Sequence, residues 1–177
     1  MKLAGLEIKT EQTTYKAFFM LMLIPVLVVS GYAVIFHSPE LELSTFGYLL
    51  LLGVCFAVYH QIAQFIHQLG HALAARATGY PMMGIRYDYV FTYSEYPLHE
   101  QFLPDRVHIQ RSLGGVVGNT LMLALVIFLW TQTGVTAHWF TRWLLTFLLF
   151  DALMLFIGSA VVMDGLLFIW HKNWKET

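Results

Sequence analysis

The chain has 177 residues, of which 58% are hydrophobic and only 12% are charged. Together with a mean hydropathy of +0.62, this composition excludes a disordered tail and an ordinary soluble domain. The formal charge of −1 argues against the basic surface by which proteins bind nucleic acid, so we expect no nucleic acid partner.

Stretches with few charges predict helices that cross a membrane. The first, over residues 17–36, has no charged residue and matches the roughly 20 residues needed to span the hydrocarbon core. It is too long for the apolar core of a signal peptide. Further spans are predicted over 43–78, 112–130 and 142–170. We therefore expect residues 1–177 to form a single all-α, polytopic membrane domain with about four transmembrane helices.

The basic residues predict how these spans are oriented. Nine of the ten Lys and Arg precede the first span, lie at the end of the second or between it and the third, or follow the fourth. By the positive-inside rule, both termini and the segment over 80–110 then lie in the cytoplasm. We expect an integral multi-pass protein of a bacterial or archaeal cell membrane.

The segment after the second span has a different period. Gly79 and Pro81 predict the end of the helix. Beyond them, aromatic residues recur at every second position, which is the period of a β-strand: Tyr87, Tyr89, Phe91 and Tyr93. We predict a short cytoplasmic β-strand or hairpin between the second and third helices.

Two histidines in the second predicted helix are candidate metal ligands. His67 and His71 are four residues apart and share one face, so their imidazoles can converge on one ion. The spacing alone is a weak signal, because eight histidines in 177 residues often produce such a pair by chance. The alternative is that both residues only solvate a helix face.

Depth in the membrane favours the metal interpretation. Counted from the cytoplasmic ends of their helices, His67, Asn119 and Asp164 lie at a similar depth, about 12 to 14 Å at 1.5 Å per residue. An ionised aspartate is costly there unless it is paired, and a metal ion held with two neutral imidazoles is a suitable partner. His67, His71 and Asp164, with water in a fourth position, predict a catalytic zinc site with one Zn²⁺ per chain.

Three motifs follow one another along the chain: His67-Gln68-Leu69-Gly70-His71 with Ala75 and Gly79, Gly114-Gly115-Val116-Val117-Gly118-Asn119, and Asp164-Gly165. Together they resemble the three signatures of the site-2 protease family of intramembrane zinc metalloproteases. The similarity covers roughly residues 60–170, and the joint order and spacing of the motifs make it specific.

The resemblance implies a metalloprotease that hydrolyses the transmembrane segment of a substrate protein within the lipid bilayer, in regulated intramembrane proteolysis. His67, His71 and Asp164 match the zinc ligands of the family. Asn119 matches an asparagine near the active centre, where its amide holds the substrate or stabilises developing negative charge. The glycines over 114–118 also favour close helix packing, and the two interpretations are compatible.

Gln68 departs from the family, which has the catalytic glutamate at this position. That glutamate is the general base, and an amide cannot accept a proton from the attacking water. We therefore predict that the metal site is kept and that hydrolysis is lost or slowed by at least ~10²-fold. The chain is then an inactive, substrate-trapping form of a protease. The alternative is a natural pseudoprotease that binds membrane segments without cleaving them.

A second departure lies just before Asp164. The Asn-x-x-Pro of the family is replaced by Phe156 and Ser159. We expect Gly158 and Ser159 to loosen this helix as a proline does.

The aromatic segment is the predicted substrate-binding element. A helix shields its peptide bonds, so the substrate has to be unwound, and an exposed strand edge can pair with the extended chain by β-augmentation. The residues concerned are Tyr87, Tyr89, Phe91 and Tyr93. The alternative is that this segment only caps the cytoplasmic mouth.

Other polar residues have simpler interpretations. We expect His60 and Gln64 to pack or to line a water path, and Asp151 to be hydrogen-bonded on the face opposite to Asp164. A rival function is a haem or metal-transport protein, but two histidines on one helix face cannot ligate haem from both sides. Three further polar residues are predicted to be flexible loop residues rather than a second metal site: His99, Glu100 and His108.

Overall fold

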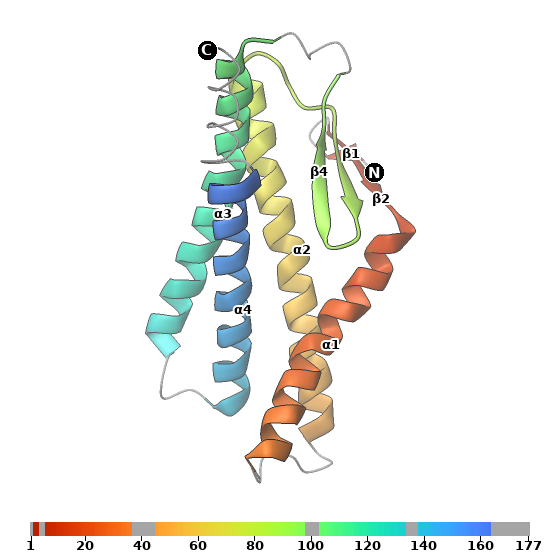
Figure 1. Cartoon of the computed structure of the whole chain (residues 1–177), viewed down its shortest axis with the longest axis vertical. Coiled ribbons are helices and arrows are strands. Elements are labelled where there is room, and N and C mark those ends of the chain that lie inside the picture. The colour runs from red at the N-terminus through yellow and green to blue at the C-terminus, as the bar shows by residue number, and fades with distance from the viewer. Residues whose placement is uncertain (1, 4–5, 37–44, 98–102, 134–137, 164–177) are drawn as a thin grey trace.

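The computed structural model describes residues 2–3, 6–36, 45–97, 103–133 and 138–163. Within these ranges, long helices form a bundle, and a small sheet lies beside one end of it (Figure 1). The helices are α1 (Gln12–Ile35), α2 (Phe46–Ala77), α3 (Asp105–Thr133) and α4 (Trp139–Ile157), which continues as the π-helix η4 (Gly158–Met163). The strands are β1 (Lys2–Leu3), β2 (Leu6–Thr10), β3 (Gly84–Asp88) and β4 (Phe91–Glu95).

In the described part of the chain, four helices are long and apolar enough to cross a membrane, as the charge-poor stretches predicted. Helices α1 and α3 begin earlier than the predicted spans, at Gln12 instead of residue 17 and at Asp105 instead of residue 112. Hydropathy marks only the apolar centre of a helix, whereas its polar ends stay helical. α2 ends at Ala77, ahead of Gly79, whose φ of 82° stops the helix.

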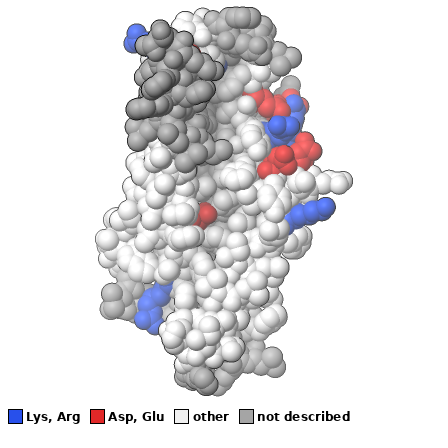
Figure 2. Space-filling view, viewed as in Figure 1, with Lys and Arg blue, Asp and Glu red and all other residues white. Residues whose placement is uncertain are grey.

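The outward faces of the helices are apolar. On α1, the side chains of Phe19, Leu27 and Val34 are between 61% and 72% exposed. Charged residues gather over the sheet, whereas the described surface below it is almost free of them (Figure 2). Such an extended apolar surface suits contact with lipid rather than water, so the fold is compatible with a multi-pass membrane protein.

The sheet has the strand order β1-β2-β3-β4. β3 and β4 form a hairpin between α2 and α3, as the aromatic alternation predicted, and its turn consists of Tyr89 and Val90. Tyr89 has a φ of 56°, the left-handed conformation that a two-residue hairpin turn requires. β2 pairs in parallel with β3, so β4 forms one edge of the sheet. The strands β1 and β2 were not predicted from the sequence.

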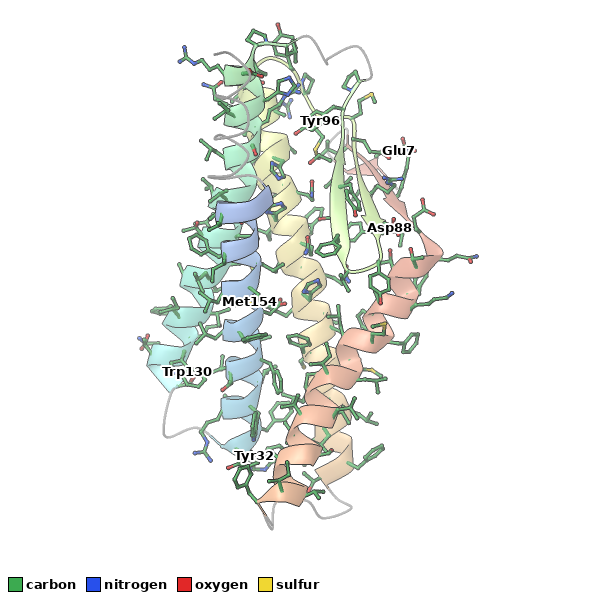
Figure 3. The ribbon with its side chains drawn as sticks, viewed as in Figure 1. Glu7, Tyr32, Asp88, Tyr96, Trp130 and Met154 are labelled. Atoms are coloured by element: carbon green, nitrogen blue, oxygen red, sulfur yellow. The ribbon has the colours of Figure 1, made fainter. Side chains whose placement is uncertain are left out.

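α2 packs against each of the other helices and against β4. α1, α2 and α4 share an apolar core that includes Leu21, Phe56 and Phe147. At the end of α1 away from the sheet, Tyr32 contacts Trp143 of α4 edge to face, with ring centroids 5.4 Å apart (Figure 3).

Glycines let α2 and α3 approach each other closely. A Cβ added at Gly70 would meet the backbone carbonyl of Gly114, and one added at Gly114 would meet the carbonyl of Gly70. A Cβ added at Gly118 would lie 2.7 Å from the carbonyl oxygen of Ile66. The close helix packing expected of the glycines over 114–118 is therefore confirmed.

We expect Gly114→Ala to destabilise the fold by about 2 kcal/mol, because its methyl group has to push α2 and α3 apart. Gly31→Ala in α1 is the matched control, since nothing lies within 4 Å of its added Cβ and alanine favours a helix. Unfolding in mixed micelles of rising SDS content measures both variants. Equal stability of the two would contradict the packing argument.

Candidate functional site

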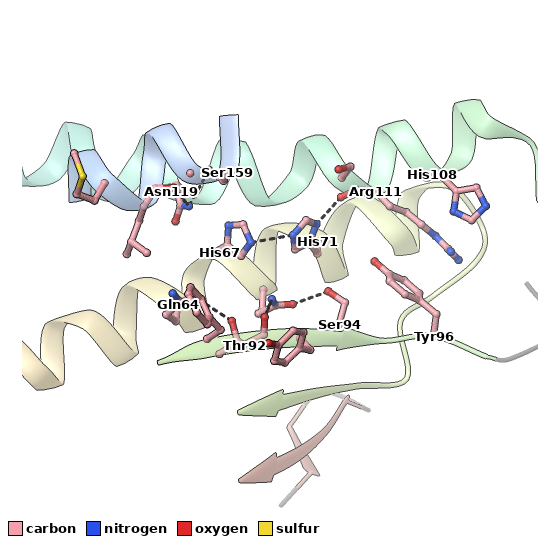
Figure 4. Close-up of a pocket in the computed structure, with 17 residues that line it drawn as sticks. Gln64, His67, His71, Thr92, Ser94, Tyr96, His108, Arg111, Asn119 and Ser159 are labelled. Atoms are coloured by element: carbon pink, nitrogen blue, oxygen red, sulfur yellow. Dashed lines mark hydrogen bonds between the residues drawn. The ribbon is translucent and has the colours of Figure 1, made fainter. Parts of the chain in front are cut away.

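A cavity of about 470 Å³ lies between α2, β4, α3 and the junction of α4 with η4 (Figure 4). Polar side chains from all four of these parts reach it. They include Gln64, His67, Gln68 and His71 from α2, Thr92 and Ser94 from β4, Arg111 and Asn119 from α3, and Ser159 from η4. Two of the residues predicted to lie at one depth, His67 and Asn119, therefore do share a cavity, and His71 lines it with them.

The two histidines face each other across one turn of α2. Their Nε2 atoms are 3.0 Å apart (Figure 4). The Nδ1 of His67 lies 3.0 Å from the carbonyl oxygen of Gly115, and the Nδ1 of His71 lies 2.8 Å from that of Arg111. A carbonyl oxygen can only accept, so each Nδ1 carries the hydrogen and donates it to α3.

This pattern fits a metal ion. In a neutral imidazole whose Nδ1 is protonated, Nε2 presents a lone pair, so the two Nε2 atoms 3.0 Å apart can both bind one cation, or they can share one proton. Two histidine nitrogens bound to one tetrahedral zinc ion lie about 3.3 Å apart. A backbone carbonyl that accepts from the other ring nitrogen is the usual means of orienting a histidine ligand.

Gly115 provides the space that the two rings occupy. A Cβ at this position would lie 2.5 Å from Cε1 of His67 and 2.6 Å from Cε1 of His71. The glycine motif of α3 therefore has two effects, because it lets the helices approach and leaves room for both imidazoles.

The third predicted ligand, Asp164, lies outside the described residues, as do His99 and Glu100. Among the residues that the structure describes, no group of three or more His, Cys, Asp or Glu could hold a metal ion. The described part of the site thus offers two nitrogen ligands, and the three-ligand zinc site stays a prediction.

Gln68 is bonded to the hairpin at both ends of its amide. Its Nε2 donates to the carbonyl oxygen of Thr92 at 2.9 Å, and its Oε1 accepts from the hydroxyl of Ser94 at 2.6 Å. The side chain is 3% exposed. No carboxylate lines the cavity among the described residues, so this part of the chain places no ordinary carboxylate base beside the histidines.

Asn119 connects α3 to the end of α4. Its Nδ2 donates to the carbonyl oxygen of Leu155 and to the hydroxyl of Ser159, each at 2.9 Å. Its Oδ1 is buried and has no hydrogen-bond partner within the described ranges. Stabilising negative charge requires a donor, and both Nδ2 hydrogens are already used. The arrangement therefore favours the other predicted role, holding a substrate, through an oxygen that accepts from a peptide N–H.

The helix loosens where the sequence predicted it. α4 passes into the π-helix η4 at Gly158, and the Ser159 hydroxyl donates to the carbonyl oxygen of Phe156. The wider turn places Ser159 beside Asn119. Single π-turns of this kind often occur at functional sites.

The predicted aromatic strand is divided by the hairpin turn. Phe91 and Tyr93 belong to β4 and line the cavity, and their role in binding a substrate stays a prediction. Tyr87 lies in the central strand β3, where burial raises the pKa of its hydroxyl to about 12. Tyr89 lies in the turn, and its hydroxyl donates to the sulfur of Met20 in α1. A turn of two residues does not interrupt the alternation of aromatic and other residues. The sequence pattern therefore could not show that Tyr87 and Tyr93 belong to different strands.

The open edge of β4 faces α2 and the cavity rather than solvent. The carbonyl oxygen of Val90 lies 3.0 Å from Nε2 of His60, and that of Thr92 accepts from Gln68. The hydroxyl of Thr92 also donates to Oε1 of Gln64 at 2.9 Å. Any peptide that pairs with β4 therefore has to share or replace these bonds.

His60 and Asp151 form a buried pair that the sequence analysis did not join. Nδ1 of His60 lies 2.9 Å and 3.2 Å from the two carboxylate oxygens of Asp151. The structural role expected for Asp151 is confirmed, and its partner is identified. An aspartate in an apolar helix requires a polar partner. Which residue becomes that partner depends on how α4 is rotated about its own axis, and the sequence does not give this rotation.

No protein-family model, curated protein or solved structure was found to match this chain. The chemical interpretation of the site therefore rests on its own geometry.

We expect Gly115→Ala to lower zinc affinity at least tenfold, because the added methyl group displaces both imidazoles from the positions fixed by their Nδ1 bonds. Val117→Ala is the control on the same helix, since Val117 is 58% exposed. Equilibrium dialysis against a zinc buffer, followed by metal analysis, measures the affinity. Unchanged affinity in a folded Gly115→Ala protein would show that the rings do not need this space.

Proposed function

We propose that the protein is an intramembrane zinc endopeptidase of the site-2 protease type, and that Gln68 in place of the catalytic glutamate makes this chain an inactive, substrate-trapping form. The observation that carries the proposal is the facing pair of Nε2 atoms of His67 and His71, 3.0 Å apart, with both Nδ1 atoms bonded to backbone carbonyls of α3. When both rings are neutral, two imidazoles oriented in this way suit a divalent borderline cation such as Zn²⁺.

His67, His71 and Asp164 would hold the zinc ion, one per chain. Bound zinc supplies Lewis acidity and makes water a stronger acid. Among the chain's own groups, Gln68 cannot accept a proton, so it leaves hydrolysis without its base. The Oδ1 of Asn119 would accept from a peptide N–H, while Phe91 and Tyr93 would contact the bound segment.

The proposed substrate is the transmembrane segment of another membrane protein. The cavity lies among helices whose outer faces are apolar, so a segment would reach it from the bilayer. Pairing with a strand edge requires an extended chain, which also exposes the peptide bonds that a helix shields. In its active form such a site would serve regulated intramembrane proteolysis, in a bacterial or archaeal cell membrane with both termini of the protease in the cytoplasm.

A natural pseudoprotease is the second candidate, and a specific observation favours it. The amide of Gln68 makes one bond as a donor and one as an acceptor to the hairpin. An ionised glutamate could still accept the bond from Ser94, but it has no hydrogen to donate to the carbonyl oxygen of Thr92. The side chain present thus matches its surroundings better than the catalytic residue of the family would.

We expect the purified protein to bind about one zinc ion per chain, and Asp164→Ala and His71→Ala to bind markedly less, because each loses a predicted ligand. His108→Ala is the control, since His108 lines the same cavity but is not a predicted ligand. Metal analysis after reconstitution and dialysis measures the content. A parent protein that binds no zinc would overturn the proposed function.

We expect Gln68→Glu to raise cleavage at least ~10²-fold over the parent, because it supplies the missing base. Reporter proteins with one transmembrane segment containing a central Gly-Pro, reconstituted in the same vesicles, serve as probes, and gel electrophoresis detects their fragments. Gln68→Ala is the control and should stay inactive. Zinc binding without any cleavage by Gln68→Glu would favour the pseudoprotease.

A further inference from the structure

A buried polar contact lies outside the cavity and has no part in the proposed chemistry. His60 of α2 is 6% exposed and Asp151 of α4 is 8% exposed, and the two side chains are bonded at 2.9 Å. Nε2 of His60 lies 3.0 Å from the carbonyl oxygen of Val90 at the hairpin turn. One imidazole thus joins α2, α4 and the hairpin.

The direction of these bonds follows from the chemistry of the groups. The carbonyl oxygen of Val90 can only accept, so Nε2 of His60 donates to it. Nδ1 then faces the carboxyl group of Asp151 with one shared proton between them. The pair is neutral as a whole, whichever side chain holds that proton, and this makes its burial among apolar helices tolerable.

The contact of His60 with Asp151 and Val90 lies next to the cavity. Each of these three residues is followed along the chain by a residue that lines the cavity: Gln64 four residues after His60, Thr92 two residues after Val90, and Leu155 four residues after Asp151. These intervals are one helical turn or one strand repeat, so the same faces continue. His60 therefore connects the hairpin wall of the cavity to the α4 wall.

The two walls separate at the outer side of the cavity. Phe91 of β4 and Met154 of α4 both line it, yet they are 46% and 44% exposed. The cavity is therefore accessible from outside at these two residues, one from the hairpin and one from α4. The distance between these walls determines what can pass.

We propose that His60 and Asp151 are positioning residues that latch the tip of the hairpin against α4 and so set the width of this lateral opening. That an extended membrane segment passes through the opening rests on the proposed function. The role of His60 and Asp151 in holding the hairpin against α4 does not. A peptide that pairs with β4 competes for the edge carbonyl of Val90, so its arrival releases His60 from the hairpin and widens the opening.

A polar latch suits this task better than an apolar one. Replacing a buried ion pair with apolar side chains of similar volume often leaves a protein equally stable or more stable, so stability alone does not require His60 and Asp151. The bonds of His60 to Asp151 and to Val90 are directional, so they hold the hairpin and α4 at one distance from each other. The bond to Val90 can also be exchanged for a bond to a peptide.

The test measures backbone hydrogen exchange of the hairpin tip, residues 88–92, by mass spectrometry on the full chain in nanodiscs. His60→Phe combined with Asp151→Leu removes the latch without leaving a buried charge, and we expect exchange at the tip to rise at least about tenfold. Asp151→Asn is the matched control. Its amide donates to Nδ1 of His60, which keeps the Val90 bond, so exchange should stay within about twofold of the parent.

Two results would overturn the latch: a double variant that exchanges like the parent, or an Asp151→Asn variant that exchanges like the double variant. If the double variant does not fold, His60→Leu combined with Asp151→Asn takes its place with the same expected rise. Absorption of Co²⁺ bound at His67 and His71 is recorded in parallel and should be equal in all variants. Loss of Co²⁺ binding in the parent would refute the proposed function, while the exchange data still decide on the latch.

Discussion

The site depends on the close approach of α2 and α3 at Gly70 and Gly114. Because no side chain separates the two backbones there, the carbonyl oxygens of Arg111 and Gly115 reach the imidazoles of α2. Each carbonyl fixes the orientation and the tautomer of one ring, and both rings then present Nε2 toward the same point. In an apolar environment these groups would be costly without partners, so the packing contact also satisfies their hydrogen bonding.

One face of α2 collects polar side chains, and each binds a different neighbour. His67 and His71 bond to α3, Gln64 and Gln68 to β4, and His60 to both α4 and the hairpin turn. They recur every three or four residues, with His67 and Gln68 adjacent, so they form one stripe along the helix. Buried polar groups demand partners more strictly than apolar groups do, so this stripe specifies where the neighbouring segments lie, whereas the apolar faces only require burial.

The helices follow from the sequence because charge-poor stretches of sufficient length have few alternatives. The approach of His67, His71 and Asn119 was predictable too, since depth along a helix is counted in residues. The pairing of His60 with Asp151 was not, because α4 is apolar nearly all round and its pattern does not specify its rotation. The parallel pairing of β2 with β3 joins segments far apart in the chain, which a five-residue alternation cannot indicate.

A side chain at position 68 cannot both donate a hydrogen bond to the hairpin and act as a general base. The carbonyl oxygen of Thr92 requires a donor, and here the amide of Gln68 supplies it. A glutamate in the same place would set two oxygens against each other unless it were protonated, and a protonated carboxyl is no base. It becomes a base only if another donor, such as the N–H of a peptide lying along β4, takes the Thr92 carbonyl. Hydrolysis at this site would thus be coupled to peptide binding, whereas Gln68 keeps the hairpin attached to α2 without a peptide.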